Sequence, residues 1–498
     1  MVDAHPMAAV QHIFVLMLEN RSFDHMCALS GIPGIQAATS ADMNSFDGVP
    51  YHFGGGAPQR MPSDPNHGFC EVVTQLAGKG TPCRPAIPYP QRTNAGFVAD
   101  YATTTVRSGL LGRKRPLPKG DRGKVMLGID MAVDSPALYA LATHYALCDQ
   151  WYSSLPGPTW PNRFFVHGAS SDGLADAPAL TDIVKWEALK GFVYPHGSIY
   201  DRLGAGNYRL YQDKSGPLSG RIPQVAALKG IGYFEVHGLD RFERDVASGA
   251  VAPYTFIEPA YGDIVSDSYL GGSSQHPLDG LAGGDRLVAR VYRAIRNSPV
   301  WESSLLIVTY DEHGGFYDSG IPARSAPPPG DGTGPHQNPY GFDFSVYGVR
   351  VPAVIVSPRI ARGTVDHGLY DHASVLATVE RRFGLEPLTA RDARAADLAH
   401  LPAGPLRPDG DCPRELPERA EPPIPAAAVA RAAASPDEPI SADFRPFLYV
   451  AQAAHREMVG DLVGLARLQP VATKGAAQLY VDEVVPQLEA AREAGRGA

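Results

Sequence analysis

The chain lacks the features that mark membrane-spanning and nucleic-acid-binding proteins. None of its apolar runs approaches the about 18 residues that a transmembrane helix needs. Its formal net charge of −9 supplies no overall basic field, so we expect no nucleic-acid partner. The first residues show no basic segment followed by an apolar stretch and a small-residue cleavage site. We therefore expect no leader, unless one has been removed, and the cytoplasm is the default location.

Cysteine is scarce, and its spacing disfavours two kinds of site. The five cysteines form no Cys-x-x-Cys pair, which argues against a zinc ribbon or a thioredoxin-like redox centre. Cys70 and Cys83 flank a short segment and could form a disulfide. On the compartment argument, we favour two free, buried thiols instead.

Apolar residues, glycine and proline are abundant. Hydrophobic residues make up 44% of the sequence, which is enough for a full core. The 52 glycines and 46 prolines favour long, structured loops over disorder. A length of 498 residues allows one large domain with an appendage, or two to three domains.

Two short apolar runs end in acidic and amide side chains. One is followed by Glu19 and Asn20, and the other by Asp311 and Glu312. A short apolar run between polar residues is typical of a strand that is buried on both faces of a parallel sheet. Because ligands bind at the carboxyl ends of such strands, these side chains predict a metal or phosphoryl-transfer site at one edge of the sheet.

The order of helical and strand patterns predicts an α/β fold. The two patterns alternate along the chain, which favours a doubly wound, mostly parallel sheet with helices on both faces. Ser135 and Pro136 are a favourable cap and first residue for one helix. We expect strands at 12–20, 145–152, 254–258, 304–310 and 351–357, and helices at 135–144, 285–296 and 373–383.

Composition divides the chain into three parts. Residues 1–400 are expected to form the main domain, in which 24–123 has the composition of long loops that could cover a site. Residues 401–440 are rich in proline and alanine, which is typical of an extended linker. Residues 441–498 become helical and are predicted to form a C-terminal appendage without catalytic groups.

Five motifs point to one family. They are Glu19-Asn-Arg-Ser-Phe-Asp-His25, Gly157-Pro-Thr-Trp-Pro-Asn-Arg163, Ser274-Gln-His-Pro277, Thr309-Tyr-Asp-Glu-His-Gly-Gly-Phe-Tyr317 and Asp371-His-Ala-Ser-Val-Leu376. In this order they resemble the bacterial phospholipase C and acid phosphatase phosphoesterase family, which belongs to the alkaline phosphatase superfamily. The resemblance spans residues 12–385 and implies an alkaline phosphatase-like phosphoesterase domain for residues 1–400.

The resemblance implies one divalent metal ion. Its ligands would be Glu19, Asn20, Asp311 and Glu312, and Thr159 would be both the remaining ligand and the nucleophile. Binding a hydroxyl to a cation is one way to obtain an alkoxide near neutral pH. Oxygen ligands favour Ca²⁺, Mg²⁺ or Mn²⁺, and carboxylates also bind Zn²⁺.

Histidines complete the implied site. His276 and His67 match active-site histidines of the family, and a histidine would protonate the leaving alcohol. His237 or His196 could complete the set. Further side chains would support the ligands or contact phosphate, namely Asp24, His25, Asn162, Arg163, His237 and His313.

Aromatic residues beside the nucleophile suggest a further role. Trp160 and Tyr152 neighbour Thr159 and could form part of an aromatic surface for a quaternary ammonium group. Plain packing is the alternative. The Arg163 side chain also has two alternative roles. It could contact phosphate, or it could brace the loop by pairing with an acid.

Together the motifs predict a metal-dependent phosphoric-ester hydrolase with a threonine nucleophile. The first choice of substrate is a phospholipid, cleaved to diacylglycerol and a phosphorylated head group, with peripheral contact to a membrane. The alternatives are an acid phosphatase acting on monoesters and a non-catalytic phosphate- or lipid-binding protein. A sulfatase is less favoured, because that chemistry normally uses a modified Cys or Ser. The resemblance also suggests that the protein is exported, which conflicts with the default expectation of a cytoplasmic location.

Overall fold

The secondary structure comes from a computed structural model, which describes residues 7–84, 87–108, 113–420, 423, 436–460 and 471–495. The strands of the main sheet are β1 (His12–Leu18), β8 (Ala146–Cys148), β9 (Tyr208–Gln212), β10 (Val236–Gly238), β11 (Tyr254–Glu258), β12 (Ser304–Tyr310), β13 (Ala353–Val356) and β14 (Thr364–Asp366). Smaller strands are β2 (Met43–Phe46), β3 (Val49–His52), β4 (Gly54–Gly55), β5 (Thr105–Ser108), β6 (Arg113–Pro116) and β7 (Leu127–Gly128).

The helices alternate with these strands along the chain. They are α1 (Phe23–Cys27), α2 (Phe69–Ala77), α3 (Phe97–Tyr101), α4 (Met131–Asp134), α5 (Pro136–His144), α6 (Thr159–Gly168), α7 (Leu180–Leu189), α8 (Ile199–Leu203), α9 (Leu239–Ser248), α10 (Ala282–Arg296), α11 (Ala373–Phe383), α12 (Ala390–Arg394), α14 (Phe444–Val459) and α15 (Lys474–Glu493). None of the helices in the described ranges is both long and apolar enough to cross a bilayer.

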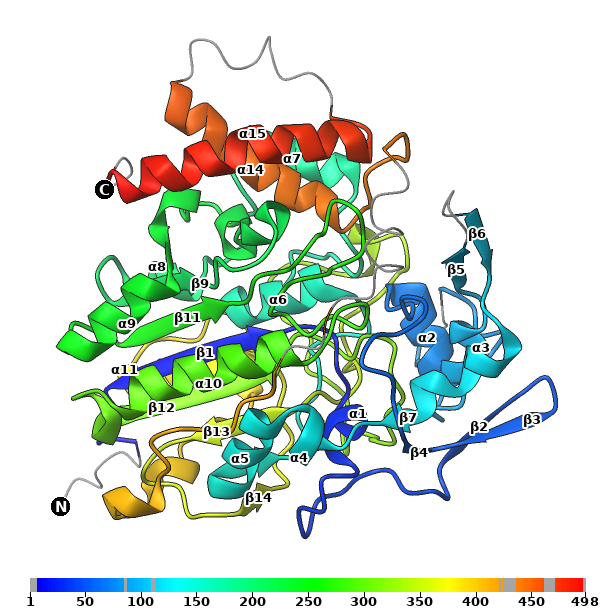
Figure 1. The fold of residues 1–498 in the computed structure, drawn as a ribbon, viewed down its shortest axis with the longest axis horizontal. Coiled ribbons are helices and arrows are strands. Elements are labelled where there is room, and N and C mark those ends of the chain that lie inside the picture. The colour runs from blue at the N-terminus through cyan, green and yellow to red at the C-terminus, as the bar shows by residue number, and fades with distance from the viewer. Residues whose placement is uncertain are drawn as a thin grey trace.

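The main sheet has eight strands in the order β10-β9-β11-β1-β12-β13-β8-β14. All neighbouring pairs are parallel except those that β13 makes with β12 and β8. The predicted doubly wound, mostly parallel sheet is therefore confirmed. In Figure 1, β1 ends beside α1, and the carboxyl ends of its parallel neighbours β11 and β12 lie on the same side.

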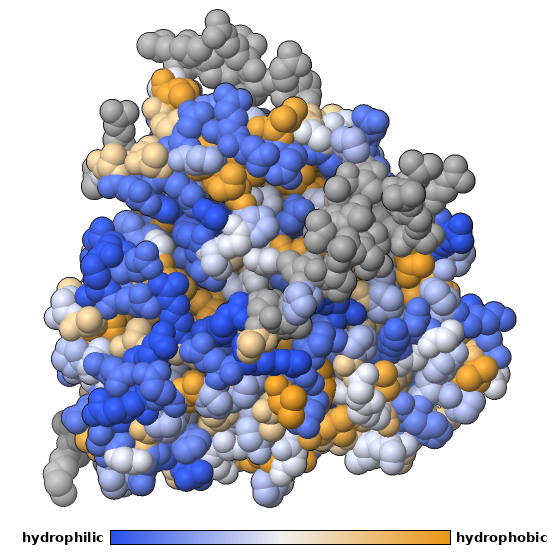
Figure 2. Space-filling model, viewed as in Figure 1, coloured by the Kyte–Doolittle hydropathy of each residue, from blue (hydrophilic) through white to orange (hydrophobic). Residues whose placement is uncertain are grey.

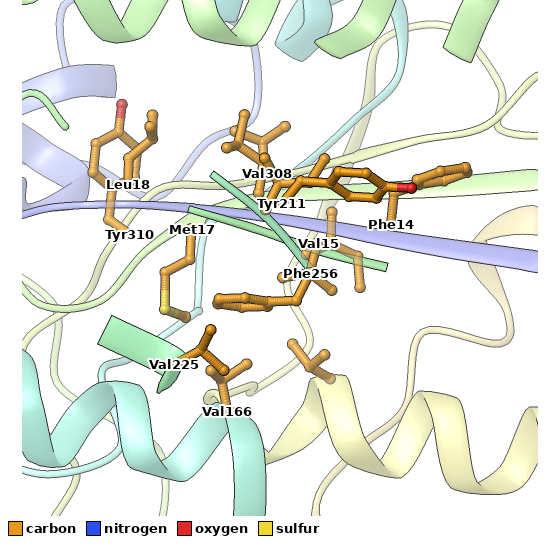
Figure 3. Packing of buried hydrophobic residues seen from close by; sticks show 14 of the residues in the cluster. Phe14, Val15, Met17, Leu18, Val166, Tyr211, Val225, Phe256, Val308 and Tyr310 are labelled. Atoms are coloured by element: carbon orange, nitrogen blue, oxygen red, sulfur yellow. The ribbon is translucent and has the colours of Figure 1, made fainter. Parts of the chain in front are cut away.

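Helices cover both faces of this sheet. The helices α5, α9 and α10 pack on one face, and α6 and α11 on the other (Figure 1). Figure 3 shows the result at β1, where Met17 points toward Val166 of α6 while Leu18 and Tyr310 point to the opposite face. Every residue from Ile13 to Leu18 is completely buried, so β1 is apolar throughout because both of its faces are covered.

Several expected elements are confirmed, and others need correction. The strands at 254–258 and 304–310 and the helix at 373–383 occur with these bounds. The strand expected at 145–152 is restricted to Ala146–Cys148. Ser135 does not cap α5, because its hydroxyl donates to Asp285 at 2.7 Å. The Asp285 carboxylate itself accepts from the first backbone N–H groups of α5 and replaces the local cap.

Residues 24–123 contain the long loops that composition indicates, at 28–42, 56–68 and 87–96 for example, and also short elements that it does not indicate. They form α1 to α3 and the strands β2 to β6, and together with residues 124–128 they make a lobe at the carboxyl ends of the parallel strands (Figure 1). This lobe has its own apolar cluster, which includes Phe53, Val72, Phe97 and Tyr101. Most of its elements span only two to five residues, which is too short for a periodic pattern to be recognised.

The C-terminal helices belong to the same core as the sheet. The Phe447 ring of α14 lies 4.9 Å from Trp160 and 5.0 Å from Tyr261, measured between ring centroids. The Trp160 indole N–H donates to the backbone carbonyl of Asp443 at 3.2 Å. The predicted helical C-terminal segment is therefore present as α14 and α15, and α14 packs against the side chain next to Thr159.

The stretch expected to be a linker is partly packed onto the main domain. Cys412 is buried, and its carbonyl accepts from Arg296 of α10 at 2.9 Å. Most of 421–435 lies outside the described residues. The domain boundaries at 400 and 440 stay a prediction.

Cys70 and Cys83 are joined by a disulfide, so the expectation of free thiols is wrong for this pair. The bond ties α2 to the loop that follows it. Cys27, Cys148 and Cys412 are free and buried. The sequence alone could not decide the pairing, because it depends on how the chain turns back after α2.

Replacing Phe447 with Ala tests the docking of α14. The ring fills a site between Trp160 and Tyr261, so the substitution should lower the free energy of unfolding by about 3–5 kcal/mol. Val459 is 49% exposed on the same helix, and Val459→Ala should cost less than about 0.5 kcal/mol. Urea denaturation monitored by tryptophan fluorescence measures both. Equal costs for the two variants would contradict the packing described here.

Candidate active site

The ends of β1 and β12 are tied together by backbone hydrogen bonds. Asn20 has a left-handed conformation (φ 60°), which asparagine tolerates better than most residues. Its N–H donates to Asp311 Oδ1 at 3.0 Å. The next N–H, of Arg21, donates to the carbonyl of Glu312 at 3.0 Å. These two bonds hold the end of β1 against the end of β12.

Arg163 holds the acidic strand end from behind. Its Nε donates to Asp311 Oδ2 at 3.0 Å, and its Nη2 donates to the carbonyls of Met17 and Leu18, each at 3.1 Å. The guanidinium is fully buried, and its Nη1 lies 4.0 Å from Glu258. Arg163 thus braces the strand ends by pairing with an acid. This is the second of the two roles that the sequence analysis left open for it.

Thr159 is the first residue of α6. Asn162 shapes the turn before it, because its side chain accepts from the N–H of Leu155 and donates to the carbonyls of Gly157 and Pro158. The Thr159 hydroxyl donates to Asn20 Oδ1 at 3.2 Å. The structure therefore brings the predicted nucleophile into contact with a predicted ligand from a distant part of the sequence.

Glu312 is oriented by the residues that follow it. Its Oε2 accepts from the N–H of Gly314 at 2.8 Å and lies 3.1 Å from His313 Nδ1. His313 is held in turn by Gln75, 2.6 Å from its Nε2. Gly314 has φ 62°, and a Cβ there would collide with the carbonyl of Asn20. The glycine of the acidic motif thus permits the two strand ends to approach each other.

Burial and mutual repulsion raise the carboxyl pKa values of the site. Burial is the main cause for Glu19, and the charge of Asp311 adds to it, which together raise the pKa of Glu19 to about 8. Burial also raises the pKa of Asp311, although Arg163 opposes the shift. Buried carboxylates this close together repel one another and destabilise the site when no further cation is present.

Two histidines face each other across the site with opposite pKa shifts. The rings of His67 and His276 are 6.1 Å apart, and His276 stacks on Tyr269 at 3.5 Å. Burial alone would lower the pKa of His67, but the carboxylates of Glu312 and Asp64 outweigh it and raise the pKa to about 10. Burial lowers the pKa of His276 well below its ordinary value, and the charge of His67 adds to this. These shifts favour a protonated His67 and a neutral His276 near neutral pH.

The neutral His276 presents a donor. Its Nδ1 accepts a long hydrogen bond of 3.4 Å from the N–H of Leu278, which assigns the proton to Nε2. That Nε2 is buried without a hydrogen-bond partner, and the nearest carboxylate oxygen, on Asp64, is 3.9 Å away. An unpaired donor of this kind suits an anionic oxygen of a substrate.

Other predicted residues hold the framework. Both carboxylate oxygens of Asp24 are occupied, by the N–H of Ala38, by Arg350 and by Ser319. Both ring nitrogens of His25 are engaged as well, by Arg21 and by the carbonyl of Leu127. These contacts leave neither side chain free to bind phosphate.

Some predicted residues are not brought to the site. His237 lies on β10, at the far edge of the main sheet, and burial lowers its pKa to about 4. His196 is exposed in the turn before α8. Trp160 is 1% exposed and Tyr152 is completely buried, so both are packing residues and the aromatic surface for an ammonium group is not formed.

Two carboxylates near His67 were not predicted. Asp64 precedes it in the same loop, and Asp443 comes from the start of α14. The charges of both raise the pKa of His67. Asp64 and Asn66 also line a cavity of about 430 Å³ beside the site. The Asp-Pro-Asn-His run at 64–67 could have indicated Asp64, whereas no local pattern marks Asp443.

Comparison with known proteins identifies the family. The model of the Phosphoesterase family matches residues 10–386. The chain belongs to the Phosphoesterase family. It is 34% identical over 429 residues to non-specific phospholipase C6 of Arabidopsis thaliana, covering 82% of this chain and 75% of that protein. Phospholipase C B of Mycobacterium tuberculosis is 26% identical over 448 residues, covering 81% of each chain.

A third relative and a solved structure are more distant. Hemolytic phospholipase C of Pseudomonas aeruginosa is 26% identical over 435 residues, covering 76% of this phosphoesterase and 53% of that protein. A Vibrio parahaemolyticus protein of the alkaline phosphatase superfamily has 12% sequence identity and a TM-score of 0.31, covering 52% of this chain and 64% of that one. A likeness this weak carries no argument. The family and the sequence relatives establish a hydrolase that acts on phosphate ester bonds.

The family generally uses divalent metals, and the strand-end residues fit one. Glu19 Oε2 and Glu312 Oε1 are buried carboxylate oxygens without a hydrogen-bond partner. Together with Asn20 Oδ1 and the Thr159 hydroxyl they form an all-oxygen donor set, which suits a hard cation. Both oxygens of Asp311 already accept hydrogen bonds. Among the described residues, no group of three or more His, Cys, Asp or Glu side chains that could hold a metal ion is found.

Metal affinity should depend on pH through Glu19. With its pKa at about 8, the carboxyl must lose a proton before it can bind a cation, so affinity should rise by about tenfold per pH unit up to that value. Calorimetric titration of the full chain with Mn²⁺, in buffers of different ionisation enthalpy, measures both the affinity and the proton released. Glu19→Gln should bind more weakly and release no proton. An affinity that is independent of pH below about 8 would refute this assignment.

Proposed function

We propose that this phosphoesterase is a metal-dependent phospholipase C with Thr159 as its nucleophile. It cleaves a phospholipid to diacylglycerol and a phosphorylated head group. The contact between the Thr159 hydroxyl and Asn20 Oδ1, at 3.2 Å, carries the proposal, because it joins α6 to the acidic strand ends. The similarity to plant and bacterial phospholipases C supports the choice of substrate.

The donor set would hold one divalent cation, Ca²⁺, Mg²⁺, Mn²⁺ or Zn²⁺. Glu19, Asn20, Glu312 and Thr159 supply oxygen atoms, and Asp311 supplies charge from its place beside Arg163. When bound, the cation lowers the pKa of the Thr159 hydroxyl and offsets the charge of the phosphate. Arg163 keeps the acids in place without occupying the position of the substrate.

Side chains of this protein carry out the nucleophilic attack and the proton transfers. Thr159 Oγ1, having given its proton to solvent, attacks phosphorus as the alkoxide, and the bond from phosphorus to the glycerol oxygen breaks; the later release of Thr159 restores the alkoxide. The His67 imidazolium gives its proton to that leaving oxygen, while His276 Nε2–H donates to a phosphate oxygen. Water then attacks the phosphothreonine, gives its proton to the neutral His67, and releases Thr159. The raised pKa of His67 and the lowered pKa of His276 support these two roles.

Substitution of Thr159 tests the nucleophile. Thr159→Ala should lower kcat on p-nitrophenyl phosphorylcholine by at least about 10³-fold, because no other residue takes over the attack. Thr159→Ser keeps the hydroxyl and should retain a substantial part of the rate. Thermal unfolding of both variants serves as the control for folding. Turnover by Thr159→Ala at the wild-type rate would exclude this mechanism.

The same assay decides between the alternatives. Hydrolysis of p-nitrophenyl phosphate in preference to the phosphorylcholine ester would indicate an acid phosphatase. Lipid binding without any turnover of metal-loaded protein would indicate a non-catalytic binding protein.

We propose that the phosphoesterase acts outside the reducing cytoplasm. The Cys70–Cys83 disulfide supports this, since such bonds persist in oxidising compartments. Peptide mass mapping of non-reduced protein from its native cells should recover the linked pair. Recovery of both cysteines as free thiols would count against export.

A further inference from the structure

A cavity of about 430 Å³ lies beside the active site. Asp64 forms part of its wall, and Asp64 Oδ1 is 3.9 Å from His276 Nε2, which is the donor proposed above for a phosphate oxygen. His276 is 1% exposed, and this Nε2 has no hydrogen-bond partner. Leu278 lines the cavity two residues further along the chain. A substituent on a phosphate bound at His276 would therefore reach into this cavity.

Most of the side chains that line the cavity are polar. Its apolar members are Met61, Pro62, Leu270 and Leu278, which is too little apolar surface for two acyl chains. In the proposed reaction the phosphate carries two substituents, the diacylglycerol that leaves and the head group that stays. A polar cavity of this size suits the head group.

Two carboxylates of the lining have an unsatisfied acceptor. Asp64 Oδ1 and Asp267 Oδ1 are both buried without a hydrogen-bond partner. The second oxygen of Asp267 is 2.5 Å from Lys474 Nζ, so only Oδ1 is left for a ligand. A buried acceptor without a donor is costly, and a ligand hydroxyl can supply the donor.

Two cations line the same cavity. Arg60 Nη2 lies 3.6 Å from Asp279, and Lys114 is an exposed residue of β6. In Figure 1, β5 and β6 lie at the outer margin of the lobe, and Figure 2 shows hydrophilic surface there. Two acids and two cations leave the lining without a net charge, so charge alone favours neither a cationic nor an anionic head group.

Hydroxyl groups complete the lining, and none of the described residues adds an aromatic ring to it. A quaternary ammonium group is typically held against aromatic rings, so the cavity lacks what a choline group needs. Thr103 is one of the hydroxyl residues, and its Oγ1 accepts from Asn66 at 3.1 Å and donates to the carbonyl of Asp100 at 2.7 Å. A polyol suits such a surface, because each of its hydroxyls can both donate and accept.

We propose that the cavity is the head-group subsite of the enzyme and that it selects an uncharged polyol, such as glycerol or inositol. Asp64 and Asp267 accept hydrogen bonds from the head-group hydroxyls, and Arg60 and Lys114 donate to them. This rests on the proposed phospholipase C function, which leaves the head group on the phosphate. A choline ester is still cleaved, because the cavity has room for it, but it gains none of these hydrogen bonds.

Binding of soluble monoesters tests the subsite on the full, Mn²⁺-loaded chain. Titration calorimetry compares myo-inositol 1-phosphate with ethyl phosphate, which has the same phosphate group and no hydroxyls. The wild type should bind the inositol ester at least about tenfold more tightly, because ethyl phosphate leaves the buried acceptors unpaired. Equal affinities for the two esters, or tighter binding of phosphocholine than of the inositol ester, would overturn the proposal.

Two substitutions test the lining itself. Asp267→Asn removes a charged acceptor; asparagine tolerates the left-handed backbone there (φ 56°), and Lys474 keeps Glu438 at 3.3 Å. It should weaken binding of the inositol ester by about fivefold or more and binding of ethyl phosphate by less than about twofold. Lys114→Gln, at an exposed position, should act in the same direction, whereas the control Asp240→Asn, 84% exposed on α9, should change neither affinity. Losses of equal size for both esters, or an unchanged preference in both lining variants, would exclude the assignment.

Two lipids separate this proposal from the proposed function. Phosphatidylinositol and phosphatidylethanol with the same acyl chains carry the same charge and differ in the head-group hydroxyls. In mixed micelles, kcat/KM should be about tenfold higher for phosphatidylinositol. If both lipids are cleaved at equal rates, the subsite is wrong and the phospholipase C function stands. If no phospholipid is cleaved and the calorimetric preference holds, the phospholipase C function is wrong and the cavity is a subsite for a soluble polyol phosphate.

Discussion

The pairing of Asp311 with Arg163 and the backbone of Asn20 is the constraint on which the site depends. One carboxylate accepts from a buried guanidinium and from a backbone N–H of the neighbouring strand end, and so joins α6, β1 and β12. Breaking a buried pair of this kind typically costs about 3–5 kcal/mol, because a charge is left uncompensated. The position of Thr159 follows from it, since Arg163 and Thr159 lie on the same turn of helix.

The charge balance around this pair explains the rest of the chemistry. Glu19 and Glu312 each keep a buried oxygen without a partner, which is a cost that a cation at that place would offset. On the other side of the site, the charges of Glu312, Asp64 and Asp443 raise the pKa of His67, and the ring of His276 stacks on Tyr269. The C-terminal segment contributes one of these acids, so it acts in the site as well as in the core.

A structural feature could be predicted from the sequence when one continuous segment encodes it, and could not when it depends on contacts between distant segments. The strand ends at Glu19 and Asp311 could be predicted, because an apolar run buried on both faces has a clear beginning and end. The lobe at 24–128 could not, because its elements are too short to show a period. Asp443 and the Cys70–Cys83 bond depend on chain segments that meet only in the fold.

The most direct test of the central claim is the location of the phosphoryl group during turnover. The full chain is mixed with p-nitrophenyl phosphorylcholine, quenched in acid within the first turnover and mapped by peptide mass spectrometry. The account predicts a phosphorylcholine adduct on Thr159, formed together with the first equivalent of p-nitrophenol. An adduct on a different side chain, or a first equivalent of p-nitrophenol with no label on the protein, would contradict it.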